Sequence, residues 1–354
     1  MTALGKKYNA VLQQTMLRIK DPKVSVPFYE KHFGMQLVHK YDFPQWKFSL
    51  YFLERPPASF KGCGEPGTPT SENYLWNMMG QSTLELTHNY GSEDDPDFSV
   101  WSGNSGSDLP SDSGLFIENG PVRGFGHIAF NVDDVYEYSA TLEEQGVRFQ
   151  KKPDEGRMKG LAFCLDPDGY WVEIVARSRS FPDVPANLSQ TMLRVKDAGA
   201  TVDFYQNVMG MQLLRKMEVP NDFTNYFLTS ALTPDEKSRY DKEKMDPSSP
   251  EASEFSHSLW YPMLEITHNH GTESDDAFQI STGNDNTWQG FGHIGFIVDN
   301  LEGMCHEMIE MGIPFHKKPE DGNMSQIAFA LDPSGYRIEL IQRDSTFKGV
   351  CSNF

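Results

Sequence analysis

Eight polar residues of the chain have side chains that together suit the binding of divalent metal ions. They are two glutamines, four glutamates and two histidines: Gln14, Glu85, His127, Glu173, Gln190, Glu265, His293 and Glu339. Each residue in the first half of the chain has a counterpart of the same type in the second half, in the same order. Amide, carboxylate and imidazole groups form an oxygen-rich ligand set, unlike a tetrahedral Cys/His zinc site. The pattern predicts two metal sites of the same composition.

The glutamates stand in the middle of apolar segments, where a carboxylate is costly to bury. Glu85 lies in TLELT and Glu173 in WVEIV. In a strand successive side chains point to opposite faces, so each carboxylate opposes the apolar neighbours on either side. An exposed polar face is the alternative interpretation of a single strand. The recurrence of these residues at paired positions favours a buried site in which the carboxylates bind a metal.

The chain contains an internal duplication. Residues 14–21 (QTMLRIKD) return as residues 190–197 (QTMLRVKD), with only Ile19 replaced by Val195. Two copies of so long a unit indicate the duplication of a domain rather than a solenoid of short repeats. A chain of 354 residues also exceeds what one core usually supports. We predict two halves, residues 1–183 and 184–354, joined by a linker at 179–187.

Each half is predicted to hold two modules of one strand, one helix and three strands. The first module has strands at 14–20, 36–42, 47–53 and 82–89 and a helix at 24–33, and the second has strands at 127–132, 147–152, 160–166 and 170–176 and a helix at 135–145. The second half repeats this order from residues 190 and 293. Residues 56–70 and 232–256 are predicted to be surface loops. The predicted fold class is α+β, with four βαβββ modules.

Composition and charge exclude several classes of partner. The net charge is −19, which repels nucleic acid and anionic membrane surfaces. No apolar run approaches the roughly 20 residues of a membrane span. The four cysteines lie far apart, as expected of free thiols in a reducing compartment. We expect a cytoplasmic protein with a small-molecule substrate. If that substrate is an anion, Arg18 and Arg194 must supply local positive charge.

Four segments resemble the glyoxalase I (lactoylglutathione lyase) family in its duplicated single-chain form. They are residues 12–18 (LQQTMLR), 84–89 (LELTHN), 123–127 (RGFGH) and 166–173 (DPDGYWVE). The resemblance covers nearly all of both halves. It implies the vicinal-oxygen-chelate fold, in which paired modules form two curved eight-stranded sheets, each around one metal. It also implies isomerisation of the hemithioacetal of methylglyoxal and glutathione to S-lactoylglutathione.

The family's functional positions can be assigned in this chain. The eight residues named first fall on its metal-ligand positions. Glu173 and Glu339 are the predicted bases that carry the proton, with Glu265 and Glu85 sharing that work. The predicted glutathione contacts, including counterparts in the second half, are Arg18, Asn89, Arg123, Lys151, Arg157, Met158, Arg194, Asn269, Lys317 and Met324. The ligand set suits Zn, Ni, Co or Mn, and resemblance to the longer eukaryotic form favours zinc.

The resemblance further implies how the modules combine. In dimeric relatives the Gln/Glu pair and the His/Glu pair of one site come from different subunits, so here they should come from different halves of a monomeric chain. Site A is predicted to hold Gln14, Glu85, His293 and Glu339, and site B to hold His127, Glu173, Gln190 and Glu265. Arg123 and Arg157 of the first half are replaced by Gln289 and Asn323 in the second. We therefore expect site B to be the stronger.

Two other functions of the same fold are alternatives. A ring-cleaving dioxygenase needs two histidines and one carboxylate around Fe(II), whereas each predicted set has one histidine. His88 and His268 would add imidazoles, but strand alternation directs them away from Glu85 and Glu265. A binding protein without catalysis does not need the paired carboxylates and arginines.

Overall fold

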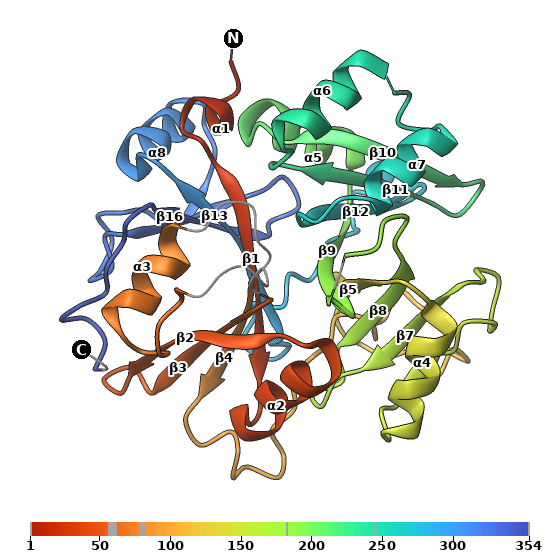
Figure 1. Cartoon of the computed structure of the whole chain (residues 1–354), viewed down its shortest axis with the longest axis horizontal. Coiled ribbons are helices and arrows are strands. Elements are labelled where there is room, and N and C mark those ends of the chain that lie inside the picture. The colour runs from red at the N-terminus through yellow and green to blue at the C-terminus, as the bar shows by residue number, and fades with distance from the viewer. Residues whose placement is uncertain (1, 56–61, 78–82, 182, 244, 353–354) are drawn as a thin grey trace.

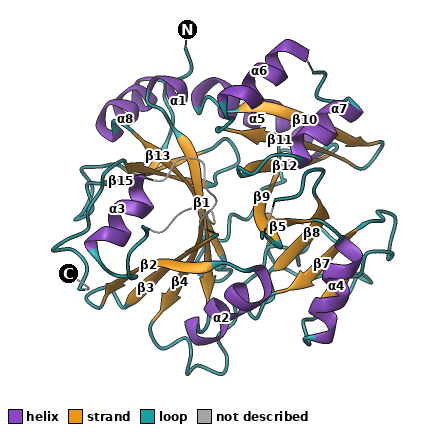
Figure 2. Cartoon of the chain, viewed as in Figure 1, coloured by secondary structure: helices purple, strands orange, loops and turns teal. Residues whose placement is uncertain are grey.

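The structure is a computed structural model that describes residues 2–55, 62–77, 83–181, 183–243 and 245–352. Strands run through the middle of the molecule and most helices lie at its periphery (Figure 2). None of the helices in these ranges is long and apolar enough to cross a membrane.

The predicted order of elements is confirmed in all four modules. The first consists of β1 (Val11–Ile19), α2 (Pro22–Phe33), β2 (Gln36–Phe43), β3 (Phe48–Glu54) and β4 (Thr83–Asn89). The second consists of β5 (Phe125–Val132), α4 (Val135–Glu144), β6 (Phe149–Lys151), β7 (Leu161–Leu165) and β8 (Trp171–Ala176). The third consists of β9 (Ala186–Val195), α5 (Ala198–Asp203) with the π-helical turn η1 (Phe204–Val208), β10 (Gln212–Val219), β11 (Phe223–Thr229) and β12 (Met263–Asn269). The fourth consists of β13 (Phe291–Val298), α8 (Leu301–Glu310), β14 (Phe315–Lys317), β15 (Ile327–Leu331) and β16 (Arg337–Gln342).

In the described part of the chain, five further short helices lie outside the modules or in their connections. They are α1 (Leu4–Lys7), α3 (Pro69–Asn77), α6 (Pro234–Glu243), α7 (Pro250–His257) and the 3-10 turn η2 (Thr272–Ser274). The prediction of a loop at 232–256 was wrong, because α6 and α7 lie there. Ser249 caps α7 by accepting a hydrogen bond from the backbone N–H of Ala252, and Phe255 packs into a small apolar cluster. Of the other predicted loop, 56–70, residues 56–61 lie outside the described ranges, and α3 begins at its end.

The strands form two eight-stranded sheets, and each sheet takes one module from each half of the chain. One sheet has the order β14-β15-β16-β13-β1-β4-β3-β2, which joins the first and fourth modules. The other has the order β10-β11-β12-β9-β5-β8-β7-β6, which joins the third and second. The joining strands are antiparallel, β1 against β13 and β5 against β9 (Figure 1). This confirms the predicted fold class. The boundary at residue 183, which lies between β8 and β9, remains a prediction.

Side-chain chemistry explains where the helices of the modules begin and end. Asp21 precedes α2 and accepts a hydrogen bond from the backbone N–H of Lys23, and Gly34 ends that helix with φ 64°. Such a left-handed conformation favours glycine, because it has no Cβ to clash. Asp134, Asp197 and Asn300 cap the helices of the other modules in the same way as Asp21. Each of these N-caps lies two positions after the end of the first strand of its module, so the helix begins at the same point of every module.

The two sheets are held together by a shared core. Apolar side chains from both sheets form one cluster, in which the rings of Phe125 and Phe291 stack 5.0 Å apart. Tyr29 donates a hydrogen bond to the Asp166 carboxylate at 2.8 Å, and Tyr205 donates one to Asp332 at 3.1 Å. These two bonds join modules of the same half. Strand pairing therefore joins modules across the halves, while the core joins the two sheets to each other and includes contacts between modules of the same half.

Replacing either buried tyrosine with phenylalanine should lower the stability of the whole molecule. In Tyr29→Phe and Tyr205→Phe the carboxyl group of Asp166 or Asp332 loses a donor in a site closed to water. A buried acceptor without its partner costs about 1–3 kcal/mol, so the thermal unfolding midpoint should fall by several degrees. Tyr136→Phe is the control, because that side chain is 51% exposed and bonds Asp154 at the surface. Equal midpoints for all three variants would contradict the role of these bonds.

Candidate metal centres

The residues predicted for site A come from four neighbouring strands of one sheet. Gln14 lies on β1, Glu85 on β4 and His293 on β13, with Glu339 on β16. These are adjacent in the order β16-β13-β1-β4. Side chains on the same face of neighbouring strands lie within contact distance of one another. The sheet therefore brings together residues that are up to 325 positions apart in the sequence.

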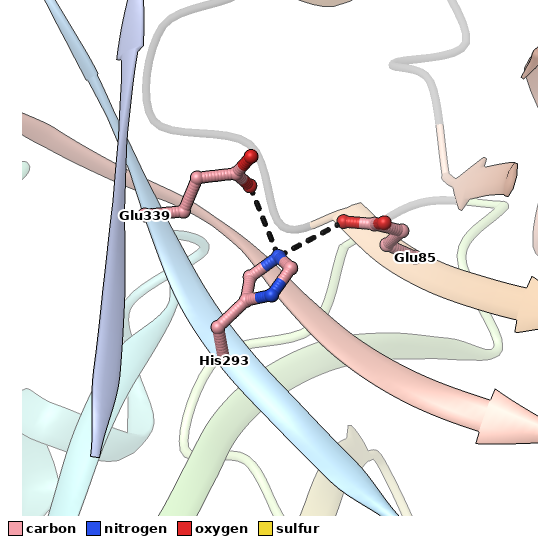
Figure 3. A group of neighbouring side chains, drawn as sticks. All are labelled: Glu85, His293 and Glu339. Carbon is pink, nitrogen blue, oxygen red and sulfur yellow. Dashed lines mark hydrogen bonds and ion pairs between the residues drawn. The ribbon is translucent and has the colours of Figure 1, made fainter. Parts of the chain in front are cut away.

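The four side chains of site A converge on one another. The Nε2 atom of Gln14 lies 2.7 Å from an oxygen of Glu85 and 2.7 Å from an oxygen of Glu339. The Nε2 atom of His293 lies 3.2 Å and 3.0 Å from the same two carboxylates. Figure 3 shows the imidazole between the two carboxylates, which extend toward it from either side.

Site B repeats this arrangement on the four central strands of the second sheet, β12-β9-β5-β8. The Nε2 atom of Gln190 lies 2.7 Å from Glu265 and 3.0 Å from Glu173. The Nε2 atom of His127 lies 3.3 Å from Glu173 and 3.4 Å from Glu265. Both sets are buried. Each of the two predicted crossed sets is thus assembled by the fold, while the role of its members as metal ligands remains a prediction.

Burial makes these groups electrostatically costly without a cation. Burial raises the pKa of Glu85 and of Glu265, and a neighbouring histidine offsets this only in part. Burial lowers the pKa of His293, but the charges of Glu339 and Glu85 outweigh it and raise the pKa to about 9. Glu173 and Glu265 likewise raise the pKa of His127 to about 9 against the effect of burial. A positive charge at each centre is therefore strongly favoured.

The donor atoms fit a divalent metal ion. In each centre the imidazole and the two carboxylates offer ligand atoms that all lie within 4.8 Å of one another. The Oε1 atom of Gln14 is buried and has no hydrogen-bond partner in the described part of the chain. Rotating this amide by half a turn exchanges its nitrogen and oxygen and aims the oxygen at the centre. The residues present therefore suit a metal of the kind that oxygen and imidazole ligands prefer.

A cavity opens over each centre. Most of the predicted substrate contacts line either the cavity of site A or that of site B. The cavity of site A has a volume of about 270 Å³ and includes Arg18, Asn89 and Met324. That of site B, about 420 Å³, includes Arg123, Arg157, Met158, Arg194 and Asn269. Lys151 and Lys317 do not belong to either lining. Their ammonium groups donate to the backbone carbonyls of Leu161 at 2.6 Å and of Ile327 at 2.8 Å.

The two partly buried arginines on β1 and β9 also hold the loops before the histidine strands. Arg18 donates to the carbonyls of Gly290 and Phe291 at 3.2 Å. Arg194 makes the equivalent bond to the carbonyl of Phe125 at 3.2 Å. Burial lowers the pKa of Arg194 to about 10, helped by the nearby charge of Arg123. At neutral pH this guanidinium is still charged and faces the cavity.

The walls of the cavities differ in ways that the sequence analysis did not identify. Site A is lined by Tyr41, Leu50 and Trp76, and by Phe347 near the C-terminus. Site B is lined by Arg215, Met217, Asn225 and His257. Comparing β3 with β11 residue by residue would have found the change from Leu50 to Asn225. Trp76, His257 and Phe347 lie in connections of unequal length, where no repeated pattern marks them.

Comparison with known proteins places the chain in a family. The model of the Glyoxalase/Bleomycin resistance protein/Dioxygenase superfamily matches residues 11–174 and 187–340. Glyoxalase I of Saccharomyces cerevisiae is 39% identical over 340 residues, which are 94% of this chain and 92% of that protein. Lactoylglutathione lyase of Schizosaccharomyces pombe is 37% identical, over 94% of this chain and 96% of that protein.

A solved structure agrees in fold. The crystal structure of glyoxalase I from Zea mays superposes with a TM-score of 0.65 at 24% identity, covering 98% of this chain and 97% of that one. The two family matches in one chain also reflect the internal duplication seen in the sequence and in the paired sheets. The chain therefore belongs to the glyoxalase I (lactoylglutathione lyase) family of this superfamily.

Proposed function

We propose that both centres catalyse the lactoylglutathione lyase reaction, the isomerisation of the hemithioacetal of methylglyoxal and glutathione to S-lactoylglutathione. The observation that carries this proposal is the pair of buried sets of one amide, one imidazole and two carboxylates, each beneath a cavity that also holds arginines. The relatives of similar length that bear the name glyoxalase I or lactoylglutathione lyase support the same reaction.

The reaction moves a proton between neighbouring carbons, which the glutamates are placed to do. A carboxylate takes the proton from the carbon that bears sulfur, which leaves an enediolate, and the proton is then delivered to the neighbouring carbon. The hydroxyl at the first carbon gives up its proton and becomes the thioester carbonyl, and the ketone oxygen at the second carbon takes up a proton and becomes a hydroxyl. We assign the transfer to Glu173 in site B and Glu339 in site A, with Glu265 and Glu85 sharing it. All four glutamates are buried, so they act where bulk water does not surround the carboxylates.

We assign the metal to Gln14, Glu85, His293 and Glu339 in site A, and to His127, Glu173, Gln190 and Glu265 in site B. When bound, a divalent cation supplies positive charge that stabilises the negative charge developing on the substrate oxygens. Zinc is our first choice, with Ni, Co or Mn as alternatives that suit the same donors. The unpartnered amide oxygen of Gln14 supports this assignment.

Glutathione carries two carboxylates, and arginine suits their recognition because its guanidinium is planar and always charged. We assign this role to Arg123, Arg157 and Arg194 at site B and to Arg18 at site A. Lys151 and Lys317 stay proposed contacts that would have to exchange their present carbonyl partners for the substrate. The chain is proposed to act in the cytoplasm as a monomer, since each centre is assembled within one chain and its cysteines form no disulfide.

The alternative functions receive less support. His88 and His268, the histidines that could complete a dioxygenase site, bind Glu93 and Glu273 at 2.7 Å and 2.8 Å instead. Each centre therefore keeps a single imidazole. A protein that only binds its ligand would not need two buried carboxylates, which are costly to bury.

Removal of the metal should abolish the activity. After dialysis against a chelator we expect turnover to fall by about 10²- to 10³-fold or more, since that is the usual cost of losing even one charge-stabilising donor. Added zinc should restore it. Metal content by atomic emission and formation of the thioester by absorbance are measured on the same sample. Full turnover in a sample without metal would disprove the assignment.

The two centres should differ in strength. Glu173→Gln should remove most of the activity at low substrate concentration, whereas Glu339→Gln should remove little. A charge-assisted hydrogen bond to a substrate carboxylate is worth about 1.5–3 kcal/mol, so the missing arginines of site A should weaken substrate use by about 10- to 150-fold. Arg337 lines site A and offers a cation there, which favours the lower end of this range. Equal losses in the two variants would show that Gln289 causes no asymmetry.

A half chain should be inactive on its own. Residues 1–183 contain Gln14 and Glu85 on one sheet but His127 and Glu173 on the other, so a monomeric half cannot assemble a centre. We expect inactive monomers, or activity confined to a dimeric fraction on size-exclusion chromatography. The full chain is the control. A monomeric half that binds metal and turns over substrate would refute the crossed assignment.

A further inference from the structure

The cavity of site B contains a cation at a place where site A has none, while Arg337 of site A lies elsewhere, on β16 with Glu339. Arg215 on β10 lines the cavity of site B. The strand of site A that corresponds to β10 is β2, and it carries His39 at the same place. His39 is fully buried, and its Nδ1 atom lies 2.6 Å from the hydroxyl of Ser71. Duplication thus left a charged wall in one cavity and an uncharged side chain at the matching place of the other.

Arg215 is held in position by neutral groups. One guanidinium nitrogen lies 3.0 Å from the Nε2 atom of His257, and the guanidinium stacks 5.0 Å above the ring of Phe227. Burial, with the charge of Arg215, lowers the pKa of His257 to about 4, so that imidazole is a neutral acceptor at physiological pH. Among the residues that the structure describes, no carboxylate lies within ion-pair distance of Arg215. The guanidinium therefore has an orientation but no direct counterion.

The register of the sheet places this cation at the level of the metal centre. Arg215 pairs with Phe227 across β10 and β11, and Phe227 pairs with Glu265 across β11 and β12. Asn269, one of the proposed glutathione contacts, lies four residues further along β12, or roughly 13 Å. Arg215 therefore faces the reacting part of the substrate rather than the end of the cavity where Asn269 lies.

The charges at this level favour an anion. Burial lowers the pKa of Arg215, and the charges of Glu265 and Glu173 offset this only in part. Two carboxylates and a divalent cation sum to zero, so a metal held there would leave the charge of Arg215 uncompensated. The corresponding part of site A, with Leu50, Trp76 and Phe347, is apolar and aromatic.

We propose that Arg215 forms an anion subsite in site B, which makes this centre selective for hemithioacetals whose aldehyde-derived group carries a carboxylate, while site A accepts apolar and aryl groups. This inference rests on the proposed function, because it assumes that the aldehyde-derived part of the substrate lies at the level of the metal centre. Arg215 binds the substrate, and His257 is a positioning residue that orients it.

The test compares two S-substituted glutathiones that differ by one carboxylate, S-benzylglutathione and S-(4-carboxybenzyl)glutathione. Their inhibition constants are measured against methylglyoxal turnover in Glu339→Gln chains, in which site B alone is active, and their binding to the otherwise unmodified chain is measured by calorimetry. Arg215→Gln should weaken the carboxylated compound by about 10- to 150-fold, and the uncharged one by less than about 3-fold. If the glutamine variant fails to fold, Arg215→Met replaces it, because an unbranched side chain can still pack on the ring of Phe227 without the charge. It should weaken the two compounds by the same factors.

Lys216→Gln is the matched control, since it removes the neighbouring cation, which lies over the ring of Tyr226. It should leave both constants unchanged. Equal weakening of both compounds by Arg215→Gln, or the same loss of preference in Lys216→Gln, would overturn the subsite. If the chain without the Arg215 substitution shows no turnover, but its calorimetric preference for the carboxylated compound is still lost in Arg215→Gln, that result would refute the proposed reaction and support the subsite. Turnover with an unchanged preference would refute the subsite alone.

Discussion

The structure depends on the mutual approach of two buried carboxylates in each sheet. In site A the carboxylates of Glu85 and Glu339 share the amide of Gln14 and the imidazole of His293, with each contact between 2.7 and 3.2 Å. Two like charges in a region closed to water repel each other and lose their hydration, so the arrangement is stable only with compensating positive charge. A raised histidine pKa supplies part of that charge, and a metal ion would supply more.

This constraint explains why the sheets combine modules from different halves. A centre needs four side chains on one face of four adjacent strands, and one module contributes only two of these strands, such as β1 and β4. Antiparallel pairing of β1 with β13, and of β5 with β9, supplies the other two. The inter-sheet core then joins the modules of each half, as in the bond from Tyr29 to Asp166. Strand pairing thereby joins the two halves, and core side chains join modules both within a half and between the halves.

Duplication has preserved the centres and changed the surroundings. The four polar groups and the arginine that follows on β1 or β9 are the same in both sites. The walls are not. Most of the differences lie on outer strands and connections that carry no part of the metal set, and one, Arg337 in place of Trp171, lies on a strand that does. Where site A has Leu50 and Trp76, site B has Asn225 and His257. Asn225 donates to Glu265, so the change reaches one of the proposed metal ligands as well. One chain can therefore hold two versions of the same chemistry.

The sequence by itself determined the order of the elements, the helix caps and the faces of the strands, because alternation and capping are local. It also determined which residue types recur, as with Glu85 and Glu265. The pairing of modules across the halves came from family resemblance, since local spacing leaves both pairings possible. Only the tertiary structure revealed α7, whose exposed face resembles a polar loop and whose apolar residues have meaning only against the sheet. The tertiary structure alone placed Arg215 next to His257, and it alone placed Phe347 in the cavity of site A. Contacts between segments so far apart depend on packing, and no repeated sequence pattern indicates them.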